Sequence, residues 1–125
     1  MRDILFRGKR CDNGKWVEGS LYLYGEDVWI DAEYDFPSTD PWVKVDPTTI
    51  GQYTGLTAKG KRIFEGDIVR LEFVDAEEIG EIFWSEEWCK IAFLSPDGSA
   101  YGIDGTTEIQ VIGNIHDNPE LLKGE

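Results

Sequence analysis

The sequence is poor in the side chains that bind metals or form disulfides, with two cysteines and one histidine among 125 residues. Cys11 and Cys89 lie far apart, and neither has a second cysteine or a histidine at metal-site spacing. We expect two reduced thiols with Cys89 buried, and a disulfide between them stays open at this stage. Because His116 is the single histidine, a metal centre with several histidine ligands is excluded. No serine or cysteine has a base assignable from its sequence neighbours, so we predict no catalytic residue and no cofactor.

The sequence is also short of positive charge. Twelve lysine and arginine residues stand against 25 aspartate and glutamate residues, which gives a net charge of −13. This charge repels nucleic-acid backbones and anionic membranes, so free nucleic acid is disfavoured and no membrane partner is expected. No apolar run is long enough to cross a membrane, and the opening stretch MRDILFRGKR carries charge where a signal peptide needs an apolar segment. We therefore expect a cytoplasmic protein.

Long amphipathic helical patterns are absent as well, and a short-period pattern takes their place. Apolar and polar residues alternate in short runs separated by turn formers such as Asn13-Gly14 and Pro96-Asp97-Gly98. With 41% hydrophobic residues, the chain is large enough for one domain that buries a core without metals or disulfides. The pattern predicts eight strands, at Ile4–Arg7, Lys15–Tyr24, Val28–Ala32, Thr49–Tyr53, Asp67–Phe73, Gly80–Trp84, Trp88–Leu94 and Thr107–Gly113.

These strands predict a mainly β fold. We expect a small antiparallel SH3-like or related barrel in the C-terminal half, from Asp67 to Ile115, with an N-terminal β subdomain and a short C-terminal helix. The segment Tyr34–Pro47 carries three prolines and no sustained period, so we interpret it as a loop or linker. Residues 1–125 then form one domain, with a candidate division into subdomains 1–46 and 47–125.

Alternation within the strands defines the inner face of the predicted barrel. Five side chains are expected to be buried there: Val69, Leu71, Phe73, Ile91 and Phe93. Near the C-terminus, Asn118 is a candidate N-cap and Pro119 suits the first helical position. Leu121 and Leu122 then need an apolar surface, supplied by the barrel or by a second subunit, and we expect a homo-oligomer.

The stretch TGLTAKGKRIFEGDIVR contains, from Gly55 to Lys61, the G-x-x-x-x-G-K spacing of a phosphate-binding loop. Arg62 stands where the serine or threonine that binds Mg²⁺ belongs. The residues that follow favour a strand, whereas a phosphate-binding loop must lead into a helix. We interpret the stretch as a basic hairpin turn and expect it to bind neither ATP nor GTP.

Three stretches occur in order along the chain: MRDILFRGKRCDNGKWVEG (1–19), IGQYTGLTAKGKRIFEGDIV (50–69) and EIQVIGNIHDNPELL (108–122). Together they resemble the YopX family of phage and prophage proteins. The resemblance implies a mainly β, oligomeric protein of bacterial viruses or prophages, without an established biochemical activity, and it carries over no catalytic residue. The chain departs from many relatives in a shorter turn within GLTAKGKRIFEGDIV and in His116, where relatives often have tyrosine.

Acidic residues form two candidate sites. Asp31, Glu33 and Asp35 lie two apart, so on a strand they share one face and offer oxygen ligands to a divalent cation. A calcium loop would need glycine at Phe36 and glutamate at Trp42, so we interpret this stretch as a solvated strand edge. The densest acidic cluster flanks one predicted strand and is interpreted as a protein-binding patch: Asp75, Glu77, Glu78, Glu86 and Glu87.

No motif assigns a reaction, so we expect a non-enzymatic accessory protein that binds itself and an unidentified host or phage protein. One alternative is a metal-dependent hydrolase or nuclease that uses the carboxylates. The other is a β-barrel that binds single-stranded nucleic acid through seven basic residues: Arg2, Arg7, Lys9, Arg10, Lys59, Lys61 and Arg62. Trp84 and Trp88 bracket an acidic turn and form either an exposed recognition pair or a packed cross-strand pair.

Overall fold

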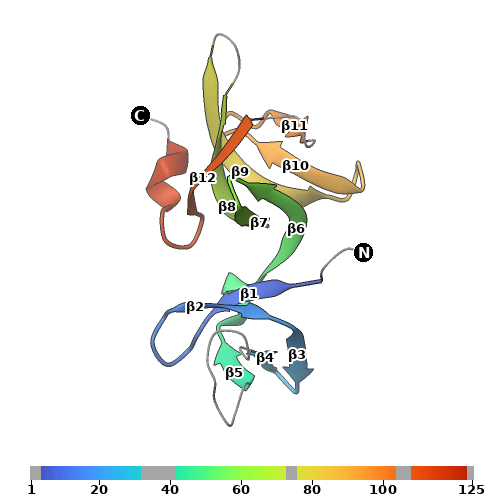
Figure 1. The fold of residues 1–125 in the computed structure, drawn as a ribbon, viewed down its shortest axis with the longest axis vertical. Helices are drawn as coiled ribbons and strands as arrows, with labels where there is room; N and C mark the ends of the chain where they lie inside the picture. Colours follow the sequence, from blue (N-terminus) through green and yellow to red (C-terminus); the bar gives the residue numbers. More distant parts are fainter. Residues whose placement is uncertain (1–3, 32–41, 73–75, 104–107, 124–125) are drawn as a thin grey trace. The chain divides into compact units, whose positions relative to one another are not determined.

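The computed structural model describes residues 4–31, 42–72, 76–103 and 108–123. These residues form antiparallel strands with two short 3₁₀ helices, so the predicted mainly β fold is confirmed. Within the same ranges, no helix has the length and apolar character needed to cross a bilayer. The chain divides into two compact units, Met1–Tyr53 and Thr54–Glu125, whose strands are labelled in Figure 1.

The first unit holds two small sheets. Its elements are β1 (Phe6–Lys9), β2 (Trp16–Gly19), β3 (Leu21–Tyr24), β4 (Asp27–Asp31), β5 (Trp42–Val45), the 3₁₀ helix η1 (Pro47–Thr49) and the start of β6 (Gly51–Ala58). β1 pairs with β2 and with the first residues of β6, whereas β3, β4 and β5 form a three-stranded sheet. The chain passes between the sheets at Ser20, whose carbonyl oxygen accepts a hydrogen bond of 3.0 Å from the amide of Asp31. A bridge between Arg10 and Val45 connects the end of β1 to β5.

The core of the first unit lies on the inner faces of these strands. Val17, Val28, Ile30 and Val45 are buried, and Leu21 and other apolar side chains pack against them. The bend that leads from β2 into β3 requires glycine, because a Cβ on Gly19 would meet the carbonyl oxygen of Asp31.

The second unit is built on one larger sheet. It contains the remainder of β6, then β7 (Lys61–Phe64), β8 (Asp67–Glu72), β9 (Glu77–Ser85), β10 (Lys90–Leu94), β11 (Ala100–Gly102), β12 (Glu108–Asn114) and the 3₁₀ helix η2 (Pro119–Lys123). Five of these strands form an antiparallel sheet in the order β11-β10-β9-β8-β12, which curls into half of a barrel (Figure 1). Ala58 and Ile63, from the β6–β7 hairpin, join the core of this sheet.

Burial in the second unit follows much of the predicted inner face. Val69, Leu71 and Phe93 are buried as predicted, whereas Ile91 is half-buried, and Phe73 lies outside the described residues. Ile68 and Ala92, which alternate with the predicted core positions, are also buried. Strands β8 and β10 therefore bury residues on both faces, which simple alternation does not predict.

The stretch with phosphate-loop spacing is a β-hairpin. Lys59 and Gly60 form the two-residue turn between β6 and β7, with φ values of 53° and 81°. Positive φ at both positions is the geometry that reverses a chain between two antiparallel strands. The residues after Lys61 form β7 and not a helix, so the hairpin prediction is confirmed.

Several sequence predictions are corrected. β5, β7 and β11 are missing from the predicted strands, and β5 falls inside the predicted loop 34–47, of which residues 34–41 lie outside the described ranges. These strands have three or four residues, too few to establish a period of two, and pairing with neighbours defines them instead.

Cys89 is exposed and not buried as predicted, because it lies in the turn after β9 at a positive φ of 51°. Cys11 is exposed too, and both cysteines are free thiols. The C-terminal segment forms a five-residue 3₁₀ helix.

Candidate functional site

The residues of the predicted acidic patch are distributed along one long strand. Glu77 and Glu78 begin β9, whereas Glu86 and Glu87 lie in the turn beyond its end; Asp75 lies outside the described residues. Glu78 and Glu86 are eight residues apart, which at roughly 3.3 Å per strand residue separates them by about 26 Å. The two pairs of glutamates are therefore at opposite ends of β9.

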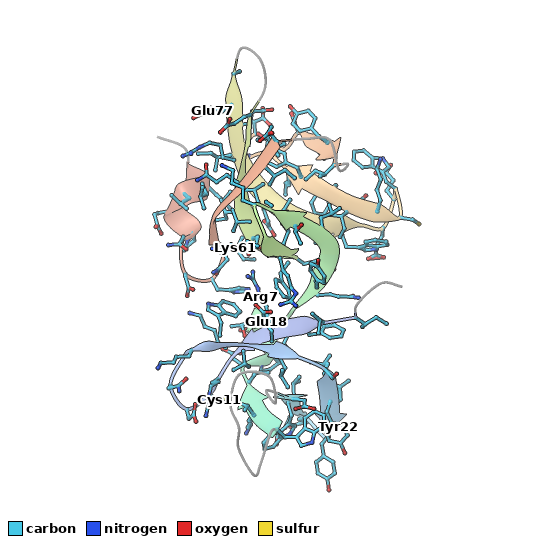
Figure 2. All side chains as sticks on the ribbon, viewed as in Figure 1. Arg7, Cys11, Glu18, Tyr22, Lys61 and Glu77 are labelled. Atoms are coloured by element: carbon cyan, nitrogen blue, oxygen red, sulfur yellow. The ribbon has the colours of Figure 1, made fainter. Side chains whose placement is uncertain are left out.

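Strand pairing creates a different acidic group that the sequence alone did not reveal. Glu72 pairs with Glu108 on one side and with Glu77 on the other, so three carboxylates form a row across β12, β8 and β9. Arg70 lies beside this row, with Nε 3.6 Å from Glu77 Oε1 and Nη1 donating a 3.2 Å hydrogen bond to Gln110 Oε1. Figure 2 labels Glu77 near the end of the sheet. The positive charge of Arg70 thus offsets part of the repulsion between the three carboxylates, which strand pairing places opposite one another.

Glu81 lies in the middle of β9, where its surroundings affect its carboxylate. It lies opposite Ile68 on β8 and Leu94 on β10. Partial burial removes water from the carboxylate and raises the pKa of Glu81 above its ordinary value.

The predicted cation site is described in part. Asp31 ends β4, opposite Trp42 on β5, and is partly buried, whereas Glu33 and Asp35 lie outside the described residues. Among the residues that the structure describes, no three His, Cys, Asp or Glu side chains gather closely enough to hold a metal ion.

The two leucines of the predicted oligomer contact are half-buried. Leu121 and Leu122 lie in η2, which packs against β9 of the same unit. The turn before η2 is fixed by Asn114, whose Oδ1 accepts hydrogen bonds of 2.9 Å from the amides of His116 and Asp117. The same chain therefore supplies part of the apolar surface that these leucines require.

The basic residues of the nucleic-acid alternative occur in both units. In the first unit, the guanidinium of Arg7 lies 4.7 Å from the ring centre of Trp16, and Nζ of Lys9 lies 5.5 Å from it. Arg10 forms an ion pair with Asp12 at 2.8 Å, which lowers the pKa of that carboxyl group. In the second unit, three basic residues are exposed on the β6–β7 hairpin: Lys59, Lys61 and Arg62. Arg2 lies outside the described residues.

Trp84 and Trp88 are both about half exposed at the end of β9 and in the turn that follows. Trp84 pairs with Ile91 across the β9–β10 ladder, and the ammonium of Lys90 lies 5.9 Å from the ring centre of Trp88. The two rings thus have different neighbours within the described part of the second unit.

A group of aromatic side chains lies on the outer face of the β3–β4–β5 sheet. Four side chains line an open hollow of about 260 Å³ with apolar walls, and we call them the aromatic face: Tyr22, Tyr24, Trp29 and Trp42. The ring centres of Tyr22 and Trp42 are 5.2 Å apart, and those of Tyr22 and Tyr24 are 6.4 Å apart. Tyr22 is labelled on this sheet in Figure 2.

The sequence contains a signal for this face that the strand patterns obscured. In LYLY, DVWID and WVKV, aromatic residues alternate with aliphatic ones, so both faces of the sheet are apolar. The aliphatic residues Val28, Ile30 and Val45 are buried in the core of the unit, which leaves the alternate positions on the outside.

Charged residues surround the aromatic face. By strand alternation, Asp27, Asp31 and Lys44 share the outer face with the four rings. Nζ of Lys44 lies 3.3 Å from Oδ1 of Asp27, so the lysine is paired within the sheet. Among the described residues, the outer face therefore combines apolar rings with charged side chains of both signs.

The comparisons with known proteins agree with the sequence motifs. The sequence model of one protein family, described as YopX protein, matches residues 5–123. No curated protein matches the chain. The match covers nearly all of the 125 residues, including both compact units and the hairpin, turn and 3₁₀ helix described above, so the chain belongs to the YopX family.

Proposed function

We propose that this phage-type YopX protein is a non-enzymatic module that binds another protein, from the host or the phage, and that the aromatic face is its binding surface. One observation carries the proposal: four aromatic side chains converge on an open apolar hollow on the outside of a sheet. Contiguous apolar patches on the surface of a soluble protein, when they exceed a few hundred Å², mark sites that bind other molecules. Tyrosine and tryptophan are also the residues that most often dominate the binding energy of protein interfaces.

Two other classes of function compete with this proposal. Aromatic rings can stack on the bases of single-stranded nucleic acid, but such sites combine the rings with a positively charged groove. Among the described residues of its sheet, the aromatic face instead has Asp27 and Asp31 beside Lys44 and no positively charged groove, which favours a protein ligand. A metal-dependent hydrolase using the carboxylates of Asp31 or the β9 glutamates is the other competitor, and metal-dependent cleavage abolished at Asp31 would establish it.

We also propose that the protein acts in the bacterial cytoplasm as a homo-oligomer. Leu121 and Leu122 are half-buried against their own unit, so each retains apolar surface that a second copy can cover. Sedimentation of the wild type and of a Leu121→Ser/Leu122→Ser variant tests this. Wild-type protein that sediments as a 14.2 kDa monomer at micromolar concentration would contradict self-association.

The proposed binding surface can be tested by affinity capture from a bacterial host lysate. The aromatic-face variant, Tyr22→Ser/Trp42→Ser, should lose a partner that the wild type retains, because it removes the two rings that lie 5.2 Å apart. Glu86→Gln/Glu87→Gln is the matched control, since it changes two exposed side chains in the other unit. Circular dichroism confirms that both variants fold. Equal capture by the wild type and the aromatic-face variant, or loss of the partner in the glutamate control alone, would overturn the proposal.

A further inference from the structure

Within the part of the chain that the structure describes, strand β3 is an edge strand that lacks the usual protection against pairing with another chain. It ends the β3–β4–β5 sheet, and its sequence LYLY contains no charge and no proline. Leu23 and Tyr24 are 65% and 68% exposed. Proteins normally protect such edges with charges, prolines or bulges, because the open backbone groups are a template for another strand.

The other sheet ends among the described strands carry that protection. β5, the opposite edge of the same sheet, contains Lys44 and forms a bridge with Arg10 at Val45. β2 contains Glu18, and β7 contains Lys61 and Arg62. β12 has a bulge between Val111 and Gly113, and β11 is three residues long. β3 is therefore the exception among them.

The backbone groups of Leu21 and Leu23 point away from β4. In an antiparallel pair, positions alternate between residues that exchange hydrogen bonds and residues that do not. The amide of Asp31 donates to the carbonyl oxygen of Ser20, which assigns the even positions of β3 to the bonds with β4. The N–H and C=O groups of Leu21 and Leu23 consequently face the open edge, where an added strand would bond to them.

The two faces of β3 specify the alternation of such a strand. Tyr22 and Tyr24 belong to the aromatic face, and Leu21 and Leu23 lie on the opposite face. The side chains of an added strand alternate in the same way, so every second one lies beside aromatic rings and the others lie beside leucine.

Charge selects the kind of side chain that lies beside the rings. Aromatic faces attract ammonium and guanidinium groups. The carboxylates of Asp27, which is paired with Lys44, and of Asp31 lie on the same face of the sheet as the rings. The chain already contains contacts of a cation with an aromatic ring, since Arg7 and Lys9 both lie over Trp16. A second copy of the chain would bring the same carboxylates to the edge and would repel them.

We propose that β3 accepts an extended segment of a partner protein as a fourth strand, with Arg or Lys at every second position and aliphatic residues between them. The inference rests on the proposed function, and it adds the binding mode and the chemistry of the ligand. Main-chain hydrogen bonds to Leu21 and Leu23 hold the segment, the rings of Tyr22 and Tyr24 receive the cations, and the opposite face receives the aliphatic side chains.

A synthetic peptide tests the binding mode directly. Fluorescence anisotropy measures binding of fluorescein-labelled Arg-Val-Arg-Val-Arg-Val-Arg to the full chain, beside the same peptide with alternate amides N-methylated and a peptide with Glu in place of Arg. Leu23→Pro removes the outward N–H of the edge, and Leu23→Ala is the matched control that keeps it. Loss of at least one main-chain hydrogen bond should weaken binding by about tenfold in Leu23→Pro and little in Leu23→Ala.

The outcomes separate the binding mode from the proposed function. Saturable binding of the Arg–Val peptide that Leu23→Pro, N-methylation and the Tyr22→Ser/Trp42→Ser variant each weaken supports the inference. Binding that depends on the aromatic rings but not on Leu23→Pro or N-methylation overturns strand addition and leaves the aromatic face as a binding surface. No binding of the Arg–Val peptide, or equal binding of the Glu peptide, overturns the inference. A wild-type dimer that Leu23→Pro dissociates, or tight binding of an oligothymidylate to the same rings, assigns the edge to a second copy or to nucleic acid and also overturns it.

Discussion

Replacement of Asp67 by alanine tests the turn that joins β7 to β8. Oδ2 of Asp67 accepts a hydrogen bond of 2.8 Å from the amide of Phe64, and the aspartate is 2% exposed. Gly66, within the turn, has a φ of 92°. Its amide donates a hydrogen bond of 2.9 Å to the carbonyl oxygen of Ile82, and its carbonyl oxygen accepts one of 2.9 Å from the amide of Ile115. The carboxylate therefore stabilises a turn that also connects β9 and the segment after β12.

The cost of the substitution follows from what remains behind. Alanine leaves the amide of Phe64 buried without its acceptor, and a buried hydrogen bond to a charged group contributes about 1.5–3 kcal/mol. We expect Asp67→Ala to lower the free energy of unfolding by about 2–3 kcal/mol. Asp67→Asn keeps an acceptor and loses the charge, so its cost should be about half as large.

Urea unfolding followed by far-UV circular dichroism measures these free energies, and hydrogen exchange reports the amide of Phe64 itself. Asp97→Ala is the matched control, because Asp97 also accepts a 2.8 Å hydrogen bond, from the amide of Ser99, but in an exposed turn. The control should unfold like the wild type. A loss below about 0.5 kcal/mol in Asp67→Ala, within the range of ordinary surface substitutions, would refute the reasoning.

Three further predictions follow from single side chains. Burial raises the pKa of Glu81, so the ionised carboxylate opposes folding. Glu81→Gln should therefore raise the melting temperature at pH 8, and by less at pH 5, where the wild-type carboxyl group is partly protonated. An equal rise at the two pH values would contradict this prediction. A methyl group on Gly80 would stand 2.6 Å from Cζ of buried Phe93, so Gly80→Ala should cost about 1–3 kcal/mol in urea unfolding, and an unchanged midpoint would be the wrong result. Lys44→Ala removes the cation beside the aromatic face and should tighten binding of the Arg–Val peptide about twofold. The control Lys15→Ala, between β1 and β2 of the same unit, should change the affinity less. Weaker binding in Lys44→Ala would argue against a cationic ligand.

The predictable part of the fold is the part where pattern and packing coincide. Val69 and Leu71 alternate with a polar neighbour at Arg70, and their burial was predicted correctly because a period of two positions side chains on one face. The hairpin that turns at Lys59 and Gly60 was predicted because the residues after Lys61 favour a strand and not a helix. Short strands were missed, because the four residues of β5 become a strand through pairing with β4 and through the bridge at Arg10, and neither partner is near in sequence.

The candidate site was not predictable for a related physical reason. An apolar side chain can lie in a core or on an outer face, and in WVKV alternation separates Trp42 and Lys44 from Val43 and Val45 without showing that Val45 is fully buried and Trp42 is 38% exposed. The distinction arises when the chain bends at Ser20 and β3, β4 and β5 enclose one core: the aliphatic positions turn inward, and the aromatic positions are left outside. For the carboxylates, the sequence predicted one acidic patch where the structure has two separate groups, because the glutamates at the two ends of β9 are separated by the length of the strand. Strand pairing instead aligns Glu72, Glu77 and Glu108, which are not neighbours in the sequence. In a small β protein of this kind, the register of the strands therefore determines which side chains can act together, and residues paired across neighbouring strands can share a site although they lie far apart in the sequence.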